Sequence, residues 1–175
     1  PQAAPPPAVP VEAAAAQRRD VPVYLTGLGT VQALNTVTVK TRVDGELQTV
    51  SYQEGKHVNA GQVLAQIDPR PFQAALDQAK ATKAKDEAQL VNAQLDLTRF
   101  ENLHQYATAQ SVDTQKALIA QLQAQIEGDQ AAIDNAATQL SYTTITSPLN
   151  GRTGIRLVDQ GNIVHATDTG GLVVI

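Results

Sequence analysis

The side chains that most often catalyse reactions or bind metals are few and widely spaced in this sequence. The three histidines, His57, His104 and His165, lie far apart and none belongs to a pattern such as His-x-x-x-His. Cysteine is absent, which excludes thiolate zinc sites and disulfides and leaves the cellular compartment open. We find no nucleophile elbow, phosphate-binding loop or carboxylate pair placed for acid–base catalysis. The sequence therefore predicts no enzyme, no metal site and no cofactor.

Charge and composition exclude further classes of function. The net charge is −4, and the lysines and arginines are scattered, which argues against nucleic-acid binding. Aromatic residues are scarce, so we expect no large aromatic-lined pocket. The sequence holds no apolar run of roughly 18 residues that would span a bilayer. It also lacks a signal peptide, which suggests a mature or trimmed chain.

The stretch from about Pro71 to Ser141 carries the clearest pattern. It is rich in residues of high helix propensity and has no Gly or Pro after Pro71 except Gly128. Two series of mainly apolar residues recur at spacings of three and four, as in a coiled coil. The first series is Phe72, Leu76, Ala79, Lys83, Asp86, Leu90, Ala93, Leu97 and Phe100, and the second is Ile119, Leu122, Ile126, Asp129, Ile133, Ala136 and Leu140.

We predict that residues 69–141 form an antiparallel helical hairpin with its tip near residues 104–110. Each arm would be roughly 45–50 Å long at a rise of 1.5 Å per residue. A single continuous helix is the alternative, but it would leave two apolar stripes unburied.

A fold about Ala107 or Thr108 would bring the two series into register. The expected pairs are Leu97 with Leu118 or Ile119, Ala93 with Leu122, Leu90 with Ile126, Ala79 with Ala136 and Leu76 with Leu140. This register places Asp86 opposite Asp129 with Lys83 near by. The three could form a polar cluster that fixes the pairing, or a solvated part of the seam.

Short β-strands are expected on both sides of the hairpin, in residues 36–68 and 142–175. In both segments apolar and polar residues alternate between turn signals. The turn glycines are Gly45, Gly55, Gly61, Gly151 and Gly161. When the two segments are overlaid, Val39 matches Ile145, Val43 matches Leu149, Val58 matches Val164, Ala60 matches Ala166 and Ile67 matches Val173. We interpret this as an internal repeat whose halves pack into one β-sandwich, although strand-rich segments can share such spacing by chance.

Two further segments precede this repeat. Residues 1–17 are rich in Pro and Ala and are expected to form a flexible linker. Residues 18–35 have strand character, but they need partner strands that this chain does not obviously contain.

The sequence from about Asp20 to Ile175 resembles the periplasmic adaptors, or membrane fusion proteins, of tripartite efflux pumps. It is most similar to the adaptors of resistance-nodulation-division (RND) transporters. The first residues that carry the resemblance are Tyr24-Leu25-Thr26-Gly27-Leu28-Gly29-Thr30, Val43-Asp44-Gly45, Glu54-Gly55, Val58, Gly61-Gln62 and Ile67-Asp68-Pro69. The others are Tyr142-Thr143, Ile145, Ser147-Pro148, Gly151, Gly154, Val158, Gly161 and Asp168.

The resemblance implies an α+β fold, in which a lipoyl-like β-sandwich is split by the helical hairpin. It also implies a β-barrel and a membrane-proximal domain, which would be incomplete here, and residues 18–35 resemble the strand that leads from them. The implied function is non-catalytic: six copies would link an inner-membrane RND transporter to a TolC-like outer-membrane channel in the periplasm. Membrane association would depend on a segment absent from this chain.

Three residues match the family's tip motif, an arginine, a leucine four residues later and a serine after the turn. Arg99, Leu103 and Ser111 match in type and order and would contact the outer-membrane channel, although the interval to Ser111 is one residue longer than usual. Ser111 could instead cap the second helix, with Asp113 in its first turn, and Arg99 could lie on a solvated face.

Other functions remain open from the sequence. The chain could serve an ABC-type exporter or a type I secretion system instead of an RND pump. It could also be an acyl-carrier domain, although no lysine follows the strand that ends at Ile67-Asp68-Pro69-Arg70. A stand-alone coiled-coil scaffold is a third possibility.

Overall fold

The structure is a computed structural model that describes residues 3–102 and 108–175. The chain divides into two units, Pro1–Ala33 and Leu34–Ile175. Residues 3–33 form no helix or strand, and their side chains are exposed. The strand expected in residues 18–35 is therefore not formed, because a strand is stable only when its backbone groups find a partner.

Eight short strands form the β module, which we define as residues 36–68 and 143–175. They are β1 (Thr38–Val39), β2 (Gly45–Val50), β3 (His57–Val58), β4 (Val63–Ile67), β5 (Thr144–Thr146), β6 (Gly151–Arg152), β7 (Ile163–Val164) and β8 (Val173–Val174). One sheet has the order β5-β4-β2-β7, and β1-β8 and β3-β6 form two further antiparallel pairs. The Gly154 N–H donates to the Val174 carbonyl (2.7 Å), which links the segment after β6 to β8.

The two halves of the β module are interleaved. Every strand pair in the described chain except β2–β4 joins a strand of the first half to one of the second. Further backbone hydrogen bonds also join the two halves: Leu47 N–H donates to Asn162 O (2.9 Å), and Thr153 N–H donates to Lys56 O (2.9 Å). Each half therefore supplies the partners that the other lacks, which confirms the fold predicted from the internal repeat.

The core of the module lies between these interleaved strands. Its buried members come from both halves and are Val39, Leu47, Tyr52, Val58, Leu64, Ala65, Ile67, Ile145, Val164, Leu172, Val173 and Ile175. Two turn glycines allow close approach to this core. A Cβ atom on Gly45 would lie 2.6 Å from Ile67 Cγ2, and one on Gly151 would lie 2.7 Å from Ile175 Cγ2.

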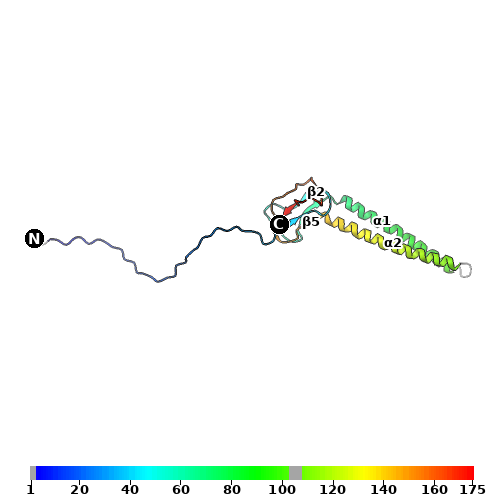
Figure 1. Cartoon of the computed structure of the whole chain (residues 1–175), viewed down its shortest axis with the longest axis horizontal. Coiled ribbons are helices and arrows are strands. Elements are labelled where there is room, and N and C mark those ends of the chain that lie inside the picture. The colour runs from blue at the N-terminus through cyan, green and yellow to red at the C-terminus, as the bar shows by residue number, and fades with distance from the viewer. Residues whose placement is uncertain (1–2, 103–107) are drawn as a thin grey trace. The chain divides into compact units, whose positions relative to one another are not determined.

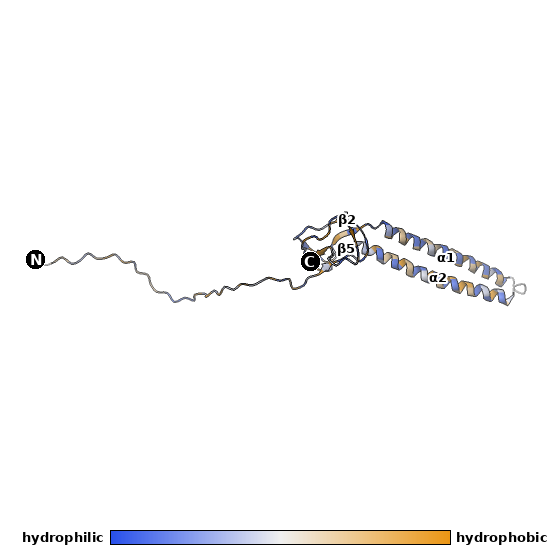
Figure 2. Ribbon diagram, turned by 45° about the horizontal axis from the view of Figure 1, so that its top comes forward, coloured by the Kyte–Doolittle hydropathy of each residue, from blue (hydrophilic) through white to orange (hydrophobic). Residues whose placement is uncertain are grey.

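Two long helices, α1 (Arg70–Asn102) and α2 (Ala109–Tyr142), run side by side as a hairpin (Figure 1). Hydrophobic and hydrophilic residues alternate along both helices (Figure 2). All residues of both predicted series are buried or half-buried, and Leu76, Asp86, Ala93 and Asp129 are buried. The seam therefore contains two buried aspartates, each with less than a tenth of its surface exposed.

Two side-chain hydrogen bonds link the helices of the hairpin. Gln115 Nε2 of α2 donates to the Ala93 carbonyl of α1 (2.8 Å), and Lys83 Nζ of α1 donates to Gln130 Oε1 of α2 (2.7 Å). The second bond places Lys83 beside the residue that follows Asp129, close to the predicted register, whereas that register placed Ala93 opposite Leu122, about two turns beyond Gln115. Helix α1 ends at Asn102 and α2 begins at Ala109. Asp86 and Asp129 are both buried, and their placement opposite each other stays a prediction.

The base of the hairpin is joined to the module at two paired strands. Ile67, the last residue of β4, donates its N–H to the Thr143 carbonyl (2.8 Å) just before β5. Asp68 caps the start of α1: its carboxylate accepts from the Arg70 N–H (3.0 Å) and from the Arg70 guanidinium (2.7 Å to Nη2). The side-chain and backbone hydrogen bonds from Arg70 lower the pKa of Asp68.

Candidate partner-binding site at the hairpin tip

Arg99 lies in the last turn of α1 and projects into solvent. Its Nη1 donates to Asp96 Oδ1 (2.7 Å), one turn earlier on the helix. About three quarters of the side-chain surface, 74%, is nevertheless exposed. A cation here is favoured by the carbonyl end of the helix dipole. Because an arginine has five N–H donors, most of the guanidinium fork remains available to an acceptor on another protein.

Ser111 lies in the first turn of α2, and it is not the cap of that helix. The N-cap is Thr108, whose Oγ1 accepts from the Ser111 N–H (3.2 Å). The two hydroxyl oxygens are 2.7 Å apart and share a hydrogen bond. Asp113 lies beyond the first turn, so the expectation that it would act there on the helix dipole is also wrong.

Leu103 and most of the predicted tip, residues 104–107, lie outside the described residues. The neighbouring ends of the two helices line a shallow, open hollow of about 330 Å³. Its lining residues are Phe100, Thr108, Gln110, Ser111, Thr114 and Gln115. The sequence alone does not reveal this hollow, because it arises only when Phe100 of α1 is brought beside the first two turns of α2.

The turn glycines mark loops of the β module, far in sequence from the tip. Gly55, Gly61 and Gly161 have positive φ angles of 68°, 81° and 89°. Gly45 and Gly151 instead fit against isoleucine side chains of the core.

Side chains that could bind a metal are scattered over the described part of the chain. No group of three or more His, Cys, Asp or Glu side chains in residues 3–102 and 108–175 could hold a metal ion. His165 Nδ1 lies 3.7 Å from Asp44 Oδ2, both side chains being more than half exposed. Neither helix in the described chain is long and apolar enough to cross a membrane.

Known proteins match both parts of this architecture. The family model described as "RND MFP, barrel-sandwich hybrid domain" matches residues 35–175. The "Multidrug resistance protein MdtA" of Pantoea ananatis is 48% identical over 171 residues, which is 97% of this chain and 42% of that protein. The MdtA of Proteus mirabilis is likewise 48% identical, over 172 residues. The chain thus spans about two fifths of the length of the curated relatives it matches.

A solved structure shows the same combination of module and hairpin. The crystal structure of MacA from Actinobacillus actinomycetemcomitans superposes with a TM-score of 0.59 and 25% sequence identity. The match covers 82% of this chain and 50% of that one.

Proposed function

Because this chain belongs to the RND membrane fusion protein family, through its barrel-sandwich hybrid domain, we propose that it is the central part of a periplasmic efflux adaptor. The adaptor would bridge an inner-membrane RND transporter and a TolC-like outer-membrane channel for drugs or other small molecules. The observation that carries this proposal is the family match across both halves of the split module and the hairpin between them. MdtA relatives named for multidrug resistance, at 48% identity, also support it.

The hairpin would reach the outer-membrane channel with its tip. The exposed guanidinium of Arg99 would donate to carbonyl or carboxylate oxygens at a helix end of the channel. Leu103 would provide an apolar anchor. Ser111 would act mainly by shaping the first turn of α2, because its hydroxyl is already bonded to Thr108.

The adaptor would function as a ring of copies in the periplasm of a Gram-negative bacterium. We propose six copies, arranged as a trimer of dimers and associated with the inner membrane, with hairpins packed side by side. Residues 1–17 would be a flexible linker, and residues 18–35 would lead to the barrel and membrane-proximal domains. The alanine-rich outer faces of both helices are suited to close packing.

Three rivals remain. An adaptor of an ABC-type exporter or a type I secretion system would share the fold, but the RND family match favours an RND pump. An acyl-carrier domain would need a lysine in the loop after β4, where Asp68, Pro69 and Arg70 stand instead. A stand-alone coiled-coil scaffold would not need the split module that the family match covers.

Site-specific crosslinking tests the proposed function. The chain has no cysteine, so a single Gln110→Cys variant carries a unique thiol at the hairpin tip. We expect a maleimide–benzophenone reagent attached to this thiol to form a photo-crosslink, by insertion into a C–H bond, to a TolC-like channel co-expressed in a Gram-negative host. Gln53→Cys, on an exposed turn of the β module, is the matched control and should give no link to the channel.

Charge reversal tests the proposed role of Arg99. Arg99→Asp should lower the crosslinking yield from position 110 several-fold, because it removes the donors offered to the channel. Arg156→Asp is the control, since Arg156 also pairs with an aspartate three residues away, at 2.8 Å, but lies on the module. Equal yields for the two variants would contradict the role of Arg99, and links from neither cysteine would contradict the adaptor.

A further inference from the structure

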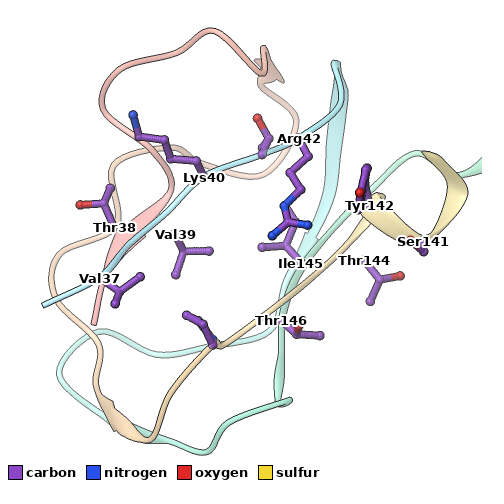
Figure 3. A pocket seen from close by; sticks show the side chains of 12 residues that line it. Val37, Thr38, Val39, Lys40, Arg42, Ser141, Tyr142, Thr144, Ile145 and Thr146 are labelled. Carbon is purple, nitrogen blue, oxygen red and sulfur yellow. The ribbon is translucent and has the colours of Figure 1, made fainter. Parts of the chain in front are cut away.

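A groove in the β module lies between the outer edges of β1 and β5 (Figure 3). This β1–β5 groove has a volume of about 470 Å³ and is lined by residues 37–42, 141–142, 144–146 and Pro148. Val39 and Ile145, which are equivalent positions of the internal repeat, are buried beside it, each with 6% of its surface exposed. The groove therefore lies where the two repeated halves face each other. Its buried lining residues are Val39, Ile145 and Thr41, and the Thr41 hydroxyl already donates to the His165 carbonyl (3.1 Å).

Both strand edges along the groove have backbone groups without partners. In an antiparallel pair, alternate residues direct their N–H and C=O groups toward the neighbouring strand. In β1, Val37 and Val39 direct their backbone groups toward β8. The N–H and C=O groups of Thr38, which lies between them, therefore point away from β8. On the other side of the groove, the Ile67 N–H donates to Thr143 O, and the Ser147 N–H donates to Gln62 O. Thr144 and Thr146 therefore direct their backbone N–H and C=O groups away from β4. The described chain thus offers two short, open strand edges to one groove.

The charges along the groove all have one sign. Lys40 and Arg42 line it, and none of its lining residues is acidic. Arg42 lies over the ring of Tyr142, 5.0 Å from its centroid. Within residues 3–102 and 108–175, neither cation forms an ion pair with a carboxylate. A ligand that brings carboxylates would thus supply the partners that the fold leaves out.

We propose that the β1–β5 groove binds an extended, acidic segment of a partner protein as an added β-strand. The backbone of this segment pairs with the open edges at Thr38, Thr144 and Thr146, as in other cases of β-strand addition. Its acidic side chains meet Lys40 and Arg42, and its apolar side chains point toward Val39 and Ile145. The proposal concerns a surface of the module away from the tip site, so it stands or fails independently of the adaptor function.

Two synthetic peptides test this proposal by NMR titration of the full 175-residue chain. One is an acetylated hexapeptide of alternating valine and glutamate, and the other replaces each glutamate by lysine. We expect the amide resonances of Thr38, Thr144 and Thr146 to shift with the glutamate peptide and not with the lysine peptide. The double variant Lys40→Gln/Arg42→Gln should weaken binding about ten-fold, because each lost charge pair weakens it about three-fold. Lys56→Gln, at an exposed turn outside the groove, should bind like the parent chain.

A backbone variant separates strand pairing from charge attraction. Thr146→Pro removes an N–H that faces the groove and is not used in pairing with β4, so it should also weaken binding by the glutamate peptide. If this variant lowers the unfolding temperature, the double charge variant decides alone.

Several outcomes would overturn the proposal. They are an absence of shifts at these amides, equal shifts with both peptides, and binding that is unchanged in the double charge variant. Shifts that grow with protein concentration when no peptide is present would assign the groove to a second copy of the chain, and would likewise contradict an acidic partner segment.

Discussion

Gly45 and Gly128 show that the effect of replacing a glycine on stability depends on the surroundings of that glycine. Gly45 begins β2, and an added Cβ would lie 2.6 Å from Ile67 Cγ2 in the core. Gly128 lies inside α2, and an added Cβ would meet nothing within 4 Å. The same substitution should therefore have opposite effects at the two positions.

We expect Gly45→Ala to destabilise the protein by about 1–3 kcal/mol through overpacking. Gly128→Ala should instead stabilise the hairpin by about 1 kcal/mol, because alanine restricts the unfolded chain and favours the helix. Chemical denaturation of both variants, followed by circular dichroism, measures the two changes. Destabilisation by both substitutions would show that Gly128 is needed for packing that the contacts do not reveal.

The Asp68–Arg70 pair gives the start of α1 a dependence on pH. Hydrogen bonds from Arg70 lower the pKa of Asp68 in the folded protein. A carboxylate with a lowered folded pKa stabilises the fold at pH values above its unfolded pKa, and this contribution is lost as the pH falls through the folded pKa. The start of α1 should thus lose this stabilisation only under acidic conditions.

We expect Arg70→Gln to raise the pKa of Asp68 toward its ordinary value, which an NMR titration of the side-chain carboxyl carbon would measure. The Arg70 backbone N–H bond persists in this variant, so the return should be partial. Lys80→Gln removes a cation from the same helix about three turns away and should leave the midpoint of Asp68 unchanged. An unchanged midpoint in Arg70→Gln would contradict the assigned cause.

At the scale of the helices, the buried aspartates of the seam weaken the hairpin. Asp129 has 8% of its surface exposed, and its Oδ2 has no hydrogen-bond partner in the part of the chain that the structure describes. Asp86 is also buried and pairs with Lys85 at 3.1 Å. A buried carboxylate oxygen without a partner costs free energy that an apolar side chain would not.

Asp129→Leu should therefore raise the stability of the hairpin by about 1–2 kcal/mol. Thermal unfolding followed at 222 nm measures this change, and sedimentation shows whether the variant stays in the same oligomeric state. Glu127→Leu, at an exposed position of α2, should change stability by no more than about 0.5 kcal/mol. A lower unfolding temperature for Asp129→Leu would show that its carboxylate has a partner.

The sequence predicted the two helices and the faces along which they pack. The spacing of apolar residues defined both seams, including the positions of Asp86 and Asp129, because burial in a two-helix hairpin depends on period alone. The register depends on where the turn begins. Thr108 and Ser111 could each supply a capping oxygen, and only the structure shows that Thr108 does so.

At the scale of the whole chain, the β module should fold without the hairpin. The chain leaves β4 and returns at β5 at positions joined by the Ile67 N–H to Thr143 O bond of 2.8 Å. A short glycine–serine loop in place of residues 70–142 therefore has little distance to span. We expect this variant to give a dispersed NMR spectrum and cooperative unfolding, whereas a stand-alone coiled-coil scaffold would leave no folded core.

The internal repeat allowed the split module to be predicted, since equivalent apolar positions in both segments needed one another for burial. Residues 18–35 were harder, because strand character in a sequence does not supply a partner strand. The β1–β5 groove could not be predicted either. It depends on two edges that are distant in sequence and become neighbours only in the folded module, with Lys40 and Arg42 beside them.

The interleaving of the two halves also sets an order of events during synthesis. β1 pairs with β8, so Thr38 must wait for Val174 to leave the ribosome before its ladder can close. The hairpin between them makes mostly local contacts and can form earlier, since local contacts close quickly. The strand made first, β1, is thus the last to be paired. A nascent chain arrested before residue 163 should carry a formed hairpin, while β1 and the β7-facing edge of β2 still lack their partners.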